Sequence, residues 1–295
     1  MSSQLSAVRQ FILERGRNAP RPEPTPPLIV VGAGKGGVGT STVATLLAST
    51  MSEHQNVLLV ETGHQLGVVH HMLGVDPART LDDLRAGRAE PAELLVPVAD
   101  RLTLLSAHSP PTAEILSAAE RKLLFRRTTS LYERFQLVVI DAGSTVDAIV
   151  TSCSDGGRFL AVTAPDRIAV VSTYALIKLL HLRCPNVALE VVANRCEEDA
   201  AARTIEALTE ACEKFLGRPV DFAGAVPDDP NFAHALAAGL SAVDAAAGSP
   251  AADALRAIGN RLMSTEQRTP RPGAAPVQHH PGGSTSTQPP RSSIS

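Results

Sequence analysis

Short apolar runs alternate with longer helical patterns through the middle of the chain. The apolar runs are rich in β-branched residues and span four to seven positions, which is typical of buried strands. They cover residues 28–31, 57–60, 102–105, 137–140, 159–162, 187–192 and 220–226. The patterns between them are long enough for crossover helices and cover residues 39–51, 112–135, 168–183, 198–216 and 251–263. We therefore expect six or seven strands joined by helices.

This alternation predicts an α/β fold, in which a mostly parallel twisted sheet is covered by helices on both faces. Strands that are buried on both faces are almost continuously apolar, and the runs above have that character. In such sheets ligands bind beyond the carboxyl ends of the strands. Residues that directly follow the apolar runs are therefore the first candidates for chemistry.

The N-terminal residues differ from this middle part. Residues 1–15 carry Leu5, Val8 and Ile12 at helical spacing, which predicts an amphipathic docking helix. Residues 16–27 include five prolines, so we expect a proline-rich, extended linker after this helix.

The C-terminal residues 265–295 are rich in Pro, Ser, Thr, Gly and Gln and have almost no large apolar side chains. Such a composition cannot bury enough surface to fold, so we expect a disordered tail. Residues 28–264 remain as one folded domain, which agrees with a chain of 295 residues that is 44% hydrophobic.

Charge and cysteine content narrow the function classes. The net charge is −3 and lysines and arginines are not clustered, which gives no reason to expect a nucleic-acid partner. The first thirty residues lack the apolar run of a signal peptide, and no later run reaches the length of a membrane span. We therefore expect a cytoplasmic protein, with buried free thiols at its widely spaced cysteines, Cys153, Cys184, Cys196 and Cys212.

A glycine-rich loop directly follows the first apolar run and opens the next helix. Its residues are Gly34, Lys35, Gly36, Gly37, Val38, Gly39, Thr40, Ser41 and Thr42. Glycines let successive N–H groups converge on phosphate oxygens, and the helix N-terminus adds its positive end. Because seven of the eight positions from Gly34 to Ser41 match GxxxxGK[ST], we predict a P-loop that binds ATP with Mg²⁺, and not merely a tight turn.

The one mismatch in this loop is informative. Thr40 stands where a P-loop normally has its lysine, whereas Lys35 lies at the start of the loop. This pattern resembles the MinD/ParA family of deviant Walker A ATPases, whose motif reads KGGxGK[ST]. The resemblance implies that Lys35 is the catalytic signature lysine, which reaches across a nucleotide-dependent homodimer, and that Ser41 coordinates Mg²⁺.

Acidic residues at two other strand ends fit this family in part. Asp141 follows the apolar run 137–140, where a Walker B carboxylate holds Mg²⁺ through water. After the run 57–60 the family has Asp-x-Asp, and its second member orients the attacking water. This chain has Glu61 and Gly63 there, and a glycine orients nothing. The neighbouring histidines His64, His70 and His71 are not expected to bind a metal, since an adjacent pair points to different sides of a helix.

Two loops near the carboxyl end of the chain complete the expected site. Asn194 and Arg195 close one apolar run, and Pro227 and Asp228 close the next. In the family these loops hold the adenine base, so the resemblance makes all four residues candidate nucleotide contacts. Ordinary strand-to-helix loops are the alternative.

Within the family the chain looks most like the FlhG (FleN) branch of flagellar-number regulators. Residues 173–178 are similar to the DAYALIK helix of that branch, and residues 224–230 to its GYIPDDP run. Gln4 and Arg9 match its DQAxxLR helix, which implies an FlhF-like GTPase as a partner of residues 1–15. Members of that branch usually end in a lipid-binding helix. Here the pattern at 251–263 is that of a core helix, so we do not expect autonomous membrane binding.

Three readings of the function remain. The first is a regulator of flagellar placement or number in which Thr40 and Gly63 make ATP hydrolysis slow or absent. The second is a pilus-localisation scaffold similar to the CpaE/TadZ group, whose P-loop lysine is often Ser or Thr. The third is a fully active ATP-driven dimerisation switch. In each case we expect recruitment to the cell pole or inner membrane face through a partner.

Overall fold

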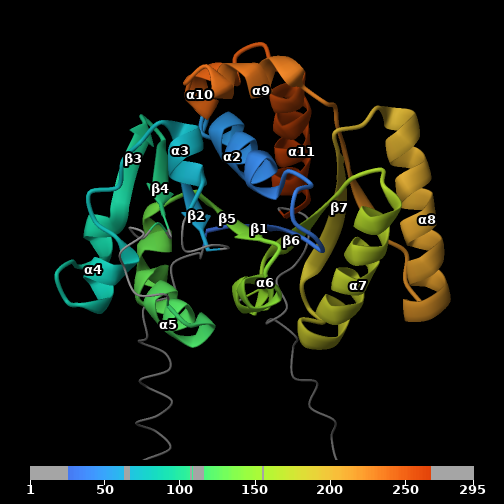
Figure 1. The fold of residues 1–295 in the computed structure, drawn as a ribbon. Helices are drawn as coiled ribbons and strands as arrows, with labels where there is room; N and C mark the ends of the chain where they lie inside the picture. Colours follow the sequence, from blue (N-terminus) through green and yellow to red (C-terminus); the bar gives the residue numbers. More distant parts are fainter. Residues whose placement is uncertain (1–25, 63–66, 107, 109–115, 155, 267–295) are drawn as a thin grey trace, which may run out of the picture.

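The computed structural model describes residues 26–62, 67–106, 108, 116–154 and 156–266. An eight-stranded sheet runs through this part of the chain in the order β3-β4-β2-β5-β1-β6-β7-β8 (Figure 1). The strands are β1 (Leu28–Ala33), β2 (Val57–Glu61), β3 (Leu95–Ala99), β4 (Leu102–Leu105), β5 (Leu137–Gly143), β6 (Arg158–Thr163), β7 (Ala188–Asn194) and β8 (Asp221–Val226).

All neighbouring strands are parallel except β3 and β4, which pair antiparallel at one edge. This confirms the α/β fold class, but the expectation of six or seven strands missed β3. Pro97 interrupts the pattern of β3, and the register shifts between Pro97 and Ala99. Proline is tolerated at such an edge because it has no N–H to donate to a second neighbour.

The central strands extend further toward their carboxyl ends than the apolar runs predict. β1 continues to Ala33 and β5 continues to Gly143. Asp141 therefore lies within β5, in register with Val31 of β1 and Glu61 of β2. Ladder hydrogen bonds hold these polar and small residues in the sheet even though their side chains are not strand-like.

Helices cover both faces of the sheet, and the sheet separates the hydrophobic core into two clusters (Figure 1). One face carries α2 (Thr40–Met51), α3 (Val69–Leu73), α9 (Pro230–Ala237), α10 (Ala242–Ala245) and α11 (Pro250–Glu266). The other carries α4 (Leu81–Arg85), α5 (Ala118–Thr128), α6 (Val146–Cys153), α7 (Arg167–Arg183) and α8 (Glu198–Leu216). Two 3₁₀ segments, Pro91–Leu94 and Thr129–Arg134, complete the described elements.

Some helices depart from the sequence pattern. The helix predicted over 112–135 is α5 followed by a 3₁₀ segment, with its first positions outside the described residues. The short helices α3, α4, α6, α9 and α10 were not predicted, because four to eight residues give too little periodicity to detect. The predicted docking helix 1–15, most of the linker 16–27 and nearly all of the tail 265–295 lie outside the described residues.

The last described helix belongs to the core. Leu255, Ile258 and Leu262 of α11 are buried in the cluster that also holds α2. A Cβ on Gly259 would lie 2.4 Å from Met51 Sδ, so the two helices pack closely at this glycine and a larger residue would have to displace the Met51 side chain. The core position expected for this helix is therefore confirmed. No helix in the described ranges is long and apolar enough to cross a membrane.

Candidate functional site

The glycine-rich loop connects β1 to α2 at the carboxyl edge of the sheet. Gly37 (φ 84°) and Gly39 (φ 90°) adopt the left-handed conformation that side-chain-bearing residues rarely take. Gly39 is the N-cap of α2, and no side chain caps this helix. The N–H groups of the first turn are therefore not used by a cap, and this leaves them available to an anion.

Close packing around the loop explains two of its glycines. A Cβ on Gly34 would lie 2.1 Å from the backbone oxygen of Ser172 in α7. A Cβ on Gly39 would lie 2.4 Å from Asn194 Nδ2 at the end of β7. The loop is thus seated between α7 and the β7–α8 connection, and a methyl group at either glycine would displace it.

The first turn of α2 contains no charged side chain. Thr40 is buried, with 8% of its surface exposed, whereas Ser41 and Thr42 are half-buried. Asp141 of β5 is 3% exposed, and its Oδ1 accepts a hydrogen bond from the N–H of Gly143 (3.0 Å). Because β5 neighbours β1, this carboxylate stands in the strand beside the one that leads into the loop.

Lys35 is the charged side chain of the loop, and it faces α7. Its Nζ lies 3.5 Å from Oδ2 of Asp166, the N-cap residue of α7. Oδ1 of Asp166 accepts the N–H of Ala169 (2.9 Å). This hydrogen bond, with the Lys35 ammonium, holds the pKa of Asp166 below its ordinary value. Sequence reasoning missed Asp166. Its place directly before a helical pattern signals a cap but not an ion pair 131 positions away.

Asn194 and Arg195 both contact the backbone of the loop. Asn194 Nδ2 donates to the carbonyl of Val38 (2.8 Å), and Arg195 Nη1 donates to the carbonyl of Gly37 (3.3 Å). Arg195 has φ 58°, which makes it the one non-glycine residue at positive φ in the described ranges. The structure thus places these side chains, which the resemblance assigned to the base, against the backbone of the glycine-rich loop.

The second loop predicted for the base lies next to the first. Asn194 is in register with Val226, and the N–H of Cys196 donates to the carbonyl of Val226 (3.2 Å). Pro227 follows half-buried and Asp228 is exposed. The four residues predicted to contact the base thus gather at one end of β7 and β8, as parallel neighbours must.

The carboxylate of Glu61 is engaged in structural hydrogen bonds. Its carboxylate is 2% exposed and accepts hydrogen bonds from the N–H groups of Val68 (2.6 Å) and Val69 (3.1 Å) and from Ser106 Oγ (2.9 Å). It ties the start of α3 to the end of β4. Gly63 and His64, which the sequence places beside it, lie outside the described residues.

Three imidazole rings lie in contact beyond Glu61, tilted against one another. The ring of His70 lies 3.9 Å from that of His71 and 4.4 Å from that of His108, measured between centroids. Burial, together with the charges of His71 and His108, lowers the pKa of His70, although Glu61 and Asp76 oppose the shift. Within the described residues no group of three His, Cys, Asp or Glu side chains could hold a metal ion.

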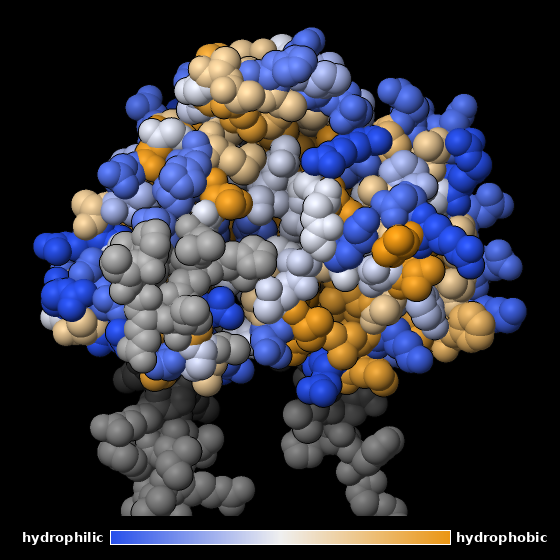
Figure 2. Space-filling model, in the orientation of Figure 1, coloured by the Kyte–Doolittle hydropathy of each residue, from blue (hydrophilic) through white to orange (hydrophobic). Residues whose placement is uncertain are grey.

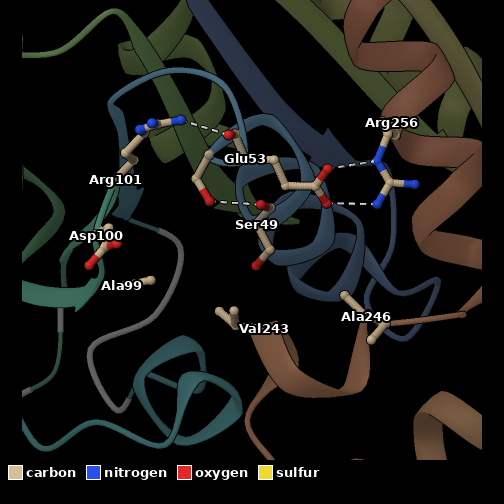
Figure 3. A pocket seen from close by; sticks show the side chains of 10 residues that line it. Ser49, Glu53, Ala99, Asp100, Arg101, Val243, Ala246 and Arg256 are labelled. Atoms are coloured by element: carbon tan, nitrogen blue, oxygen red, sulfur yellow. Dashed lines mark hydrogen bonds and ion pairs between the residues drawn. The ribbon is translucent and has the colours of Figure 1, made fainter.

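A pocket of about 620 Å³ lies at the other end of α2 (Figure 3). Its charged side chains are largely paired, since Arg256 binds both Glu53 oxygens (2.7 and 3.2 Å) and Arg101 donates to the Glu53 carbonyl (2.7 Å). α2 has twelve residues, so the pocket is roughly 15 Å from the glycine-rich loop. It is separate from the site built on the loop.

Apolar side chains are exposed beside the loop. Figure 2 shows orange surface gathered over the region of α7. Val146 at the start of α6 is 49% exposed, and Ile168 and Val171 at the start of α7 are 69% and 59% exposed. Since α7 also contacts Gly34 and Lys35, this surface adjoins the candidate site.

Comparisons with known proteins agree with this geometry. The family model of the CobQ/CobB/MinD/ParA nucleotide binding domain matches residues 29–242. The antiactivator FleN of Pseudomonas aeruginosa is 26% identical over 241 residues, which are 80% of this chain and 86% of FleN.

Solved structures show the same fold. The MinC:MinD cell division protein complex of Aquifex aeolicus is similar with a TM-score of 0.64 and 19% identity, over 86% of this chain and 99% of that one. The septum site-determining protein MinD of Pyrococcus horikoshii, complexed with Mg-ADP, has a TM-score of 0.63 and 19% identity, over 83% and 99%.

Proposed function

The chain belongs to the CobQ/CobB/MinD/ParA family of nucleotide-binding domains, and from this we infer that it is a regulator that binds ATP with Mg²⁺ at residues 34–42. The observation that supports this best is the loop itself. Gly34, Gly37 and Gly39 are left-handed or closely packed, the loop opens a helix without a side-chain cap, and a buried aspartate stands in the neighbouring strand.

The residues present fit a magnesium nucleotide. Loop N–H groups and the N-terminus of α2 suit the phosphates. Ser41 would hold Mg²⁺ directly and Asp141 through water. Asn194, Arg195, Pro227 and Asp228 would contact the nucleotide from the two loops beyond β7 and β8. A magnesium ion held by these residues would neutralise part of the negative charge of the phosphates.

We propose that this site hydrolyses ATP slowly or not at all. Thr40 supplies no charge to the phosphates, and the sequence has Gly63 where the family orients the water. Glu61, the nearest acidic residue in sequence, already accepts three hydrogen bonds, from Val68, Val69 and Ser106. A carboxylate that is so engaged is a poor general base.

We propose that nucleotide binding favours a homodimer formed on the face that carries the loop. Lys35 lies at this face, and its ion pair with Asp166 is weak because both side chains are partly exposed, by 34% and 49%. The exposed Val146, Ile168 and Val171 supply apolar area next to it. Contact with a second copy would cover these side chains.

The similarity to FleN favours a flagellar client, in which the protein regulates flagellar placement or number. We propose that residues 1–15 bind an FlhF-like GTPase and that a partner recruits the protein to the cell pole or inner membrane face. A pilus-localisation scaffold is the competing proposal, and the substitution of Thr40 for lysine favours it.

Calorimetry with Mg-ATP and Mg-ADP tests the central proposal. We expect a dissociation constant in the micromolar to millimolar range for the whole chain, a thermal shift upward, and a larger sedimentation coefficient with Mg-ATP. Absence of both heat and thermal shift at millimolar Mg-ATP would overturn nucleotide binding. Binding without any change in sedimentation would overturn the dimer alone.

A further inference from the structure

The glycine-rich loop and the first turn of α2 offer little positive charge to a phosphate chain. Position 40 is a threonine, and the first turn of α2 has no charged residue. Lys35 is paired with Asp166. The phosphate chain of a nucleoside triphosphate carries several negative charges, and backbone N–H groups alone supply only partial charges. A further cation beside the loop would complete the site.

Arg195 is a cation that directly contacts this loop. Its Nη1 donates to the carbonyl of Gly37 (3.3 Å), and its Nη2 is 3.8 Å from the position that a Cβ on Gly39 would take. Both hydrogen bonds from Asn194 and Arg195 use carbonyl oxygens of the loop. They do not use the N–H groups that bind an anion.

The guanidinium of Arg195 is also uncompensated. Within the described part of the chain, no carboxylate lies within ion-pair distance of it, in contrast to Lys35. A guanidinium has five N–H donors in a planar fork that matches phosphate oxygens. One donor is used on Gly37, and the exposed side chain leaves the others open to a ligand.

The backbone of Arg195 supports a ligand role independently. Its φ of 58° is a left-handed conformation, which is sterically unfavourable for a residue with a Cβ. Such conformations persist where a surrounding structure enforces them, and they cluster at ligand clamps. Here the left-handed residue directly follows Asn194, whose side chain is fixed on the carbonyl of Val38 (2.8 Å).

We propose that Arg195 supplies the positive charge that meets the phosphate chain of the nucleotide, in place of the lysine absent at position 40. This inference rests on the proposed binding of ATP. It assigns Arg195 to the phosphates, where the sequence resemblance implied the base. The charge reaches the loop from the β7–α8 connection and not from the start of α2.

Calorimetry on five proteins tests the assignment: wild type, Arg195→Ala, Thr40→Lys, the double variant, and Arg203→Ala as a control that removes an exposed arginine from α8. Loss of one charged hydrogen bond weakens binding about ten- to a hundredfold. We expect that loss for Mg-ATP in Arg195→Ala and no change in Arg203→Ala. In the Thr40→Lys background, the same Arg195→Ala change should cost less than about threefold, because the lysine already supplies the charge.

A second ligand separates phosphate from base. Magnesium tripolyphosphate has no base, so its affinity should fall in parallel with that of Mg-ATP in Arg195→Ala. An unchanged affinity for tripolyphosphate, with a loss for Mg-ATP, would return Arg195 to the base and overturn the proposal. An equal loss in both Thr40 backgrounds would also overturn it, since the role would then be structural. If wild type binds no nucleotide, the proposed function fails first.

Discussion

Lys35 Nζ and Asp166 Oδ2 lie 3.5 Å apart, so the amino group at the mouth of the glycine-rich loop is held by the residue that caps α7. If Lys35 serves a second copy of the chain, this ion pair must open when the dimer forms. Asp166 therefore connects the N-terminus of α7 to Lys35, and its ion pair reports whether Lys35 is held within its own chain.

Asp166→Asn should favour the nucleotide-dependent dimer. The amide can still cap α7 through Ala169, so the melting temperature should stay nearly constant, while Lys35 loses a weak, solvent-exposed partner. We expect the dimer dissociation constant with Mg-ATP to fall by up to about fivefold in sedimentation experiments. A weaker dimer in Asp166→Asn would show that the carboxylate takes part in the interface.

Gly39→Ala should abolish nucleotide binding. The new Cβ would lie 2.4 Å from Asn194 Nδ2 and would sit on a backbone with φ 90°. Gly87→Ala is the matched control, because Gly87 also has positive φ (68°) but its Cβ would meet no atom within 4 Å. Gly87→Ala should lose about 1–2 kcal/mol of unfolding free energy, Gly39→Ala should lose at least as much, and only Gly39→Ala should lose Mg-ATP binding. Equal binding by both would contradict the packing argument.

Thr40→Lys should tighten ATP binding but should not by itself restore turnover. Gly63→Asp alone should leave binding weak. The double variant should release phosphate well beyond either single change, because a carboxylate acts only on a well-held γ-phosphate. Steady-state phosphate release measures all four proteins. A wild type that is already as fast as the double variant would refute the proposed loss of hydrolysis.

Stability should fall as the pH drops below 6.5, and His70 should contribute to the fall. Burial lowers the pKa of His70 in the folded state from 6.5, so the unfolded chain takes up a proton first. The stabilisation is complete above pH 6.5 and is lost below it, by at most about 1.4 kcal/mol per pH unit. Urea unfolding of wild type and His70→Phe at pH 7 and pH 5 measures the contribution of His70 to this loss of unfolding free energy. An unchanged pH slope in His70→Phe would assign the fall to other groups.

Deletion of residues 1–20 should leave the melting temperature within about 2 °C of that of the whole chain, because β1 begins at Leu28 and the core clusters of the described residues are built from Leu28 onward. Binding to a GTPase partner should be lost. A large fall in the melting temperature would mean that these residues are part of the folded domain.

The sequence predicts the central strands and the loop well because their signals are local. The apolar runs that became β1 and β5 are each followed by the residues that form the site. Contacts across long separations leave no such signal. Arg195 and Gly37 are 158 positions apart, and nothing in either local pattern indicates that they meet.

Glu61 shows that even contacts between residues nearer in sequence cannot be predicted from the local pattern. Its position suggested a place in a catalytic Asp-x-Asp pattern, whereas its partners are N–H groups at Val68 and Val69 and a hydroxyl at Ser106. Those donors exist only once α3 and β4 have formed. Propensity does not reveal which carboxylate will be used to satisfy a helix N-terminus in the folded chain.

The antiparallel strand β3 has a consequence for how copies of the chain can associate. It forms one border of the sheet, it is five residues long, and it carries Pro97 next to a register shift. An irregular border that lacks a donor is a poor template for a further strand, which protects this border of the sheet against pairing with another copy of the chain. Association of copies is thereby left to the opposite border at β8 and to the surfaces built from helices and loops.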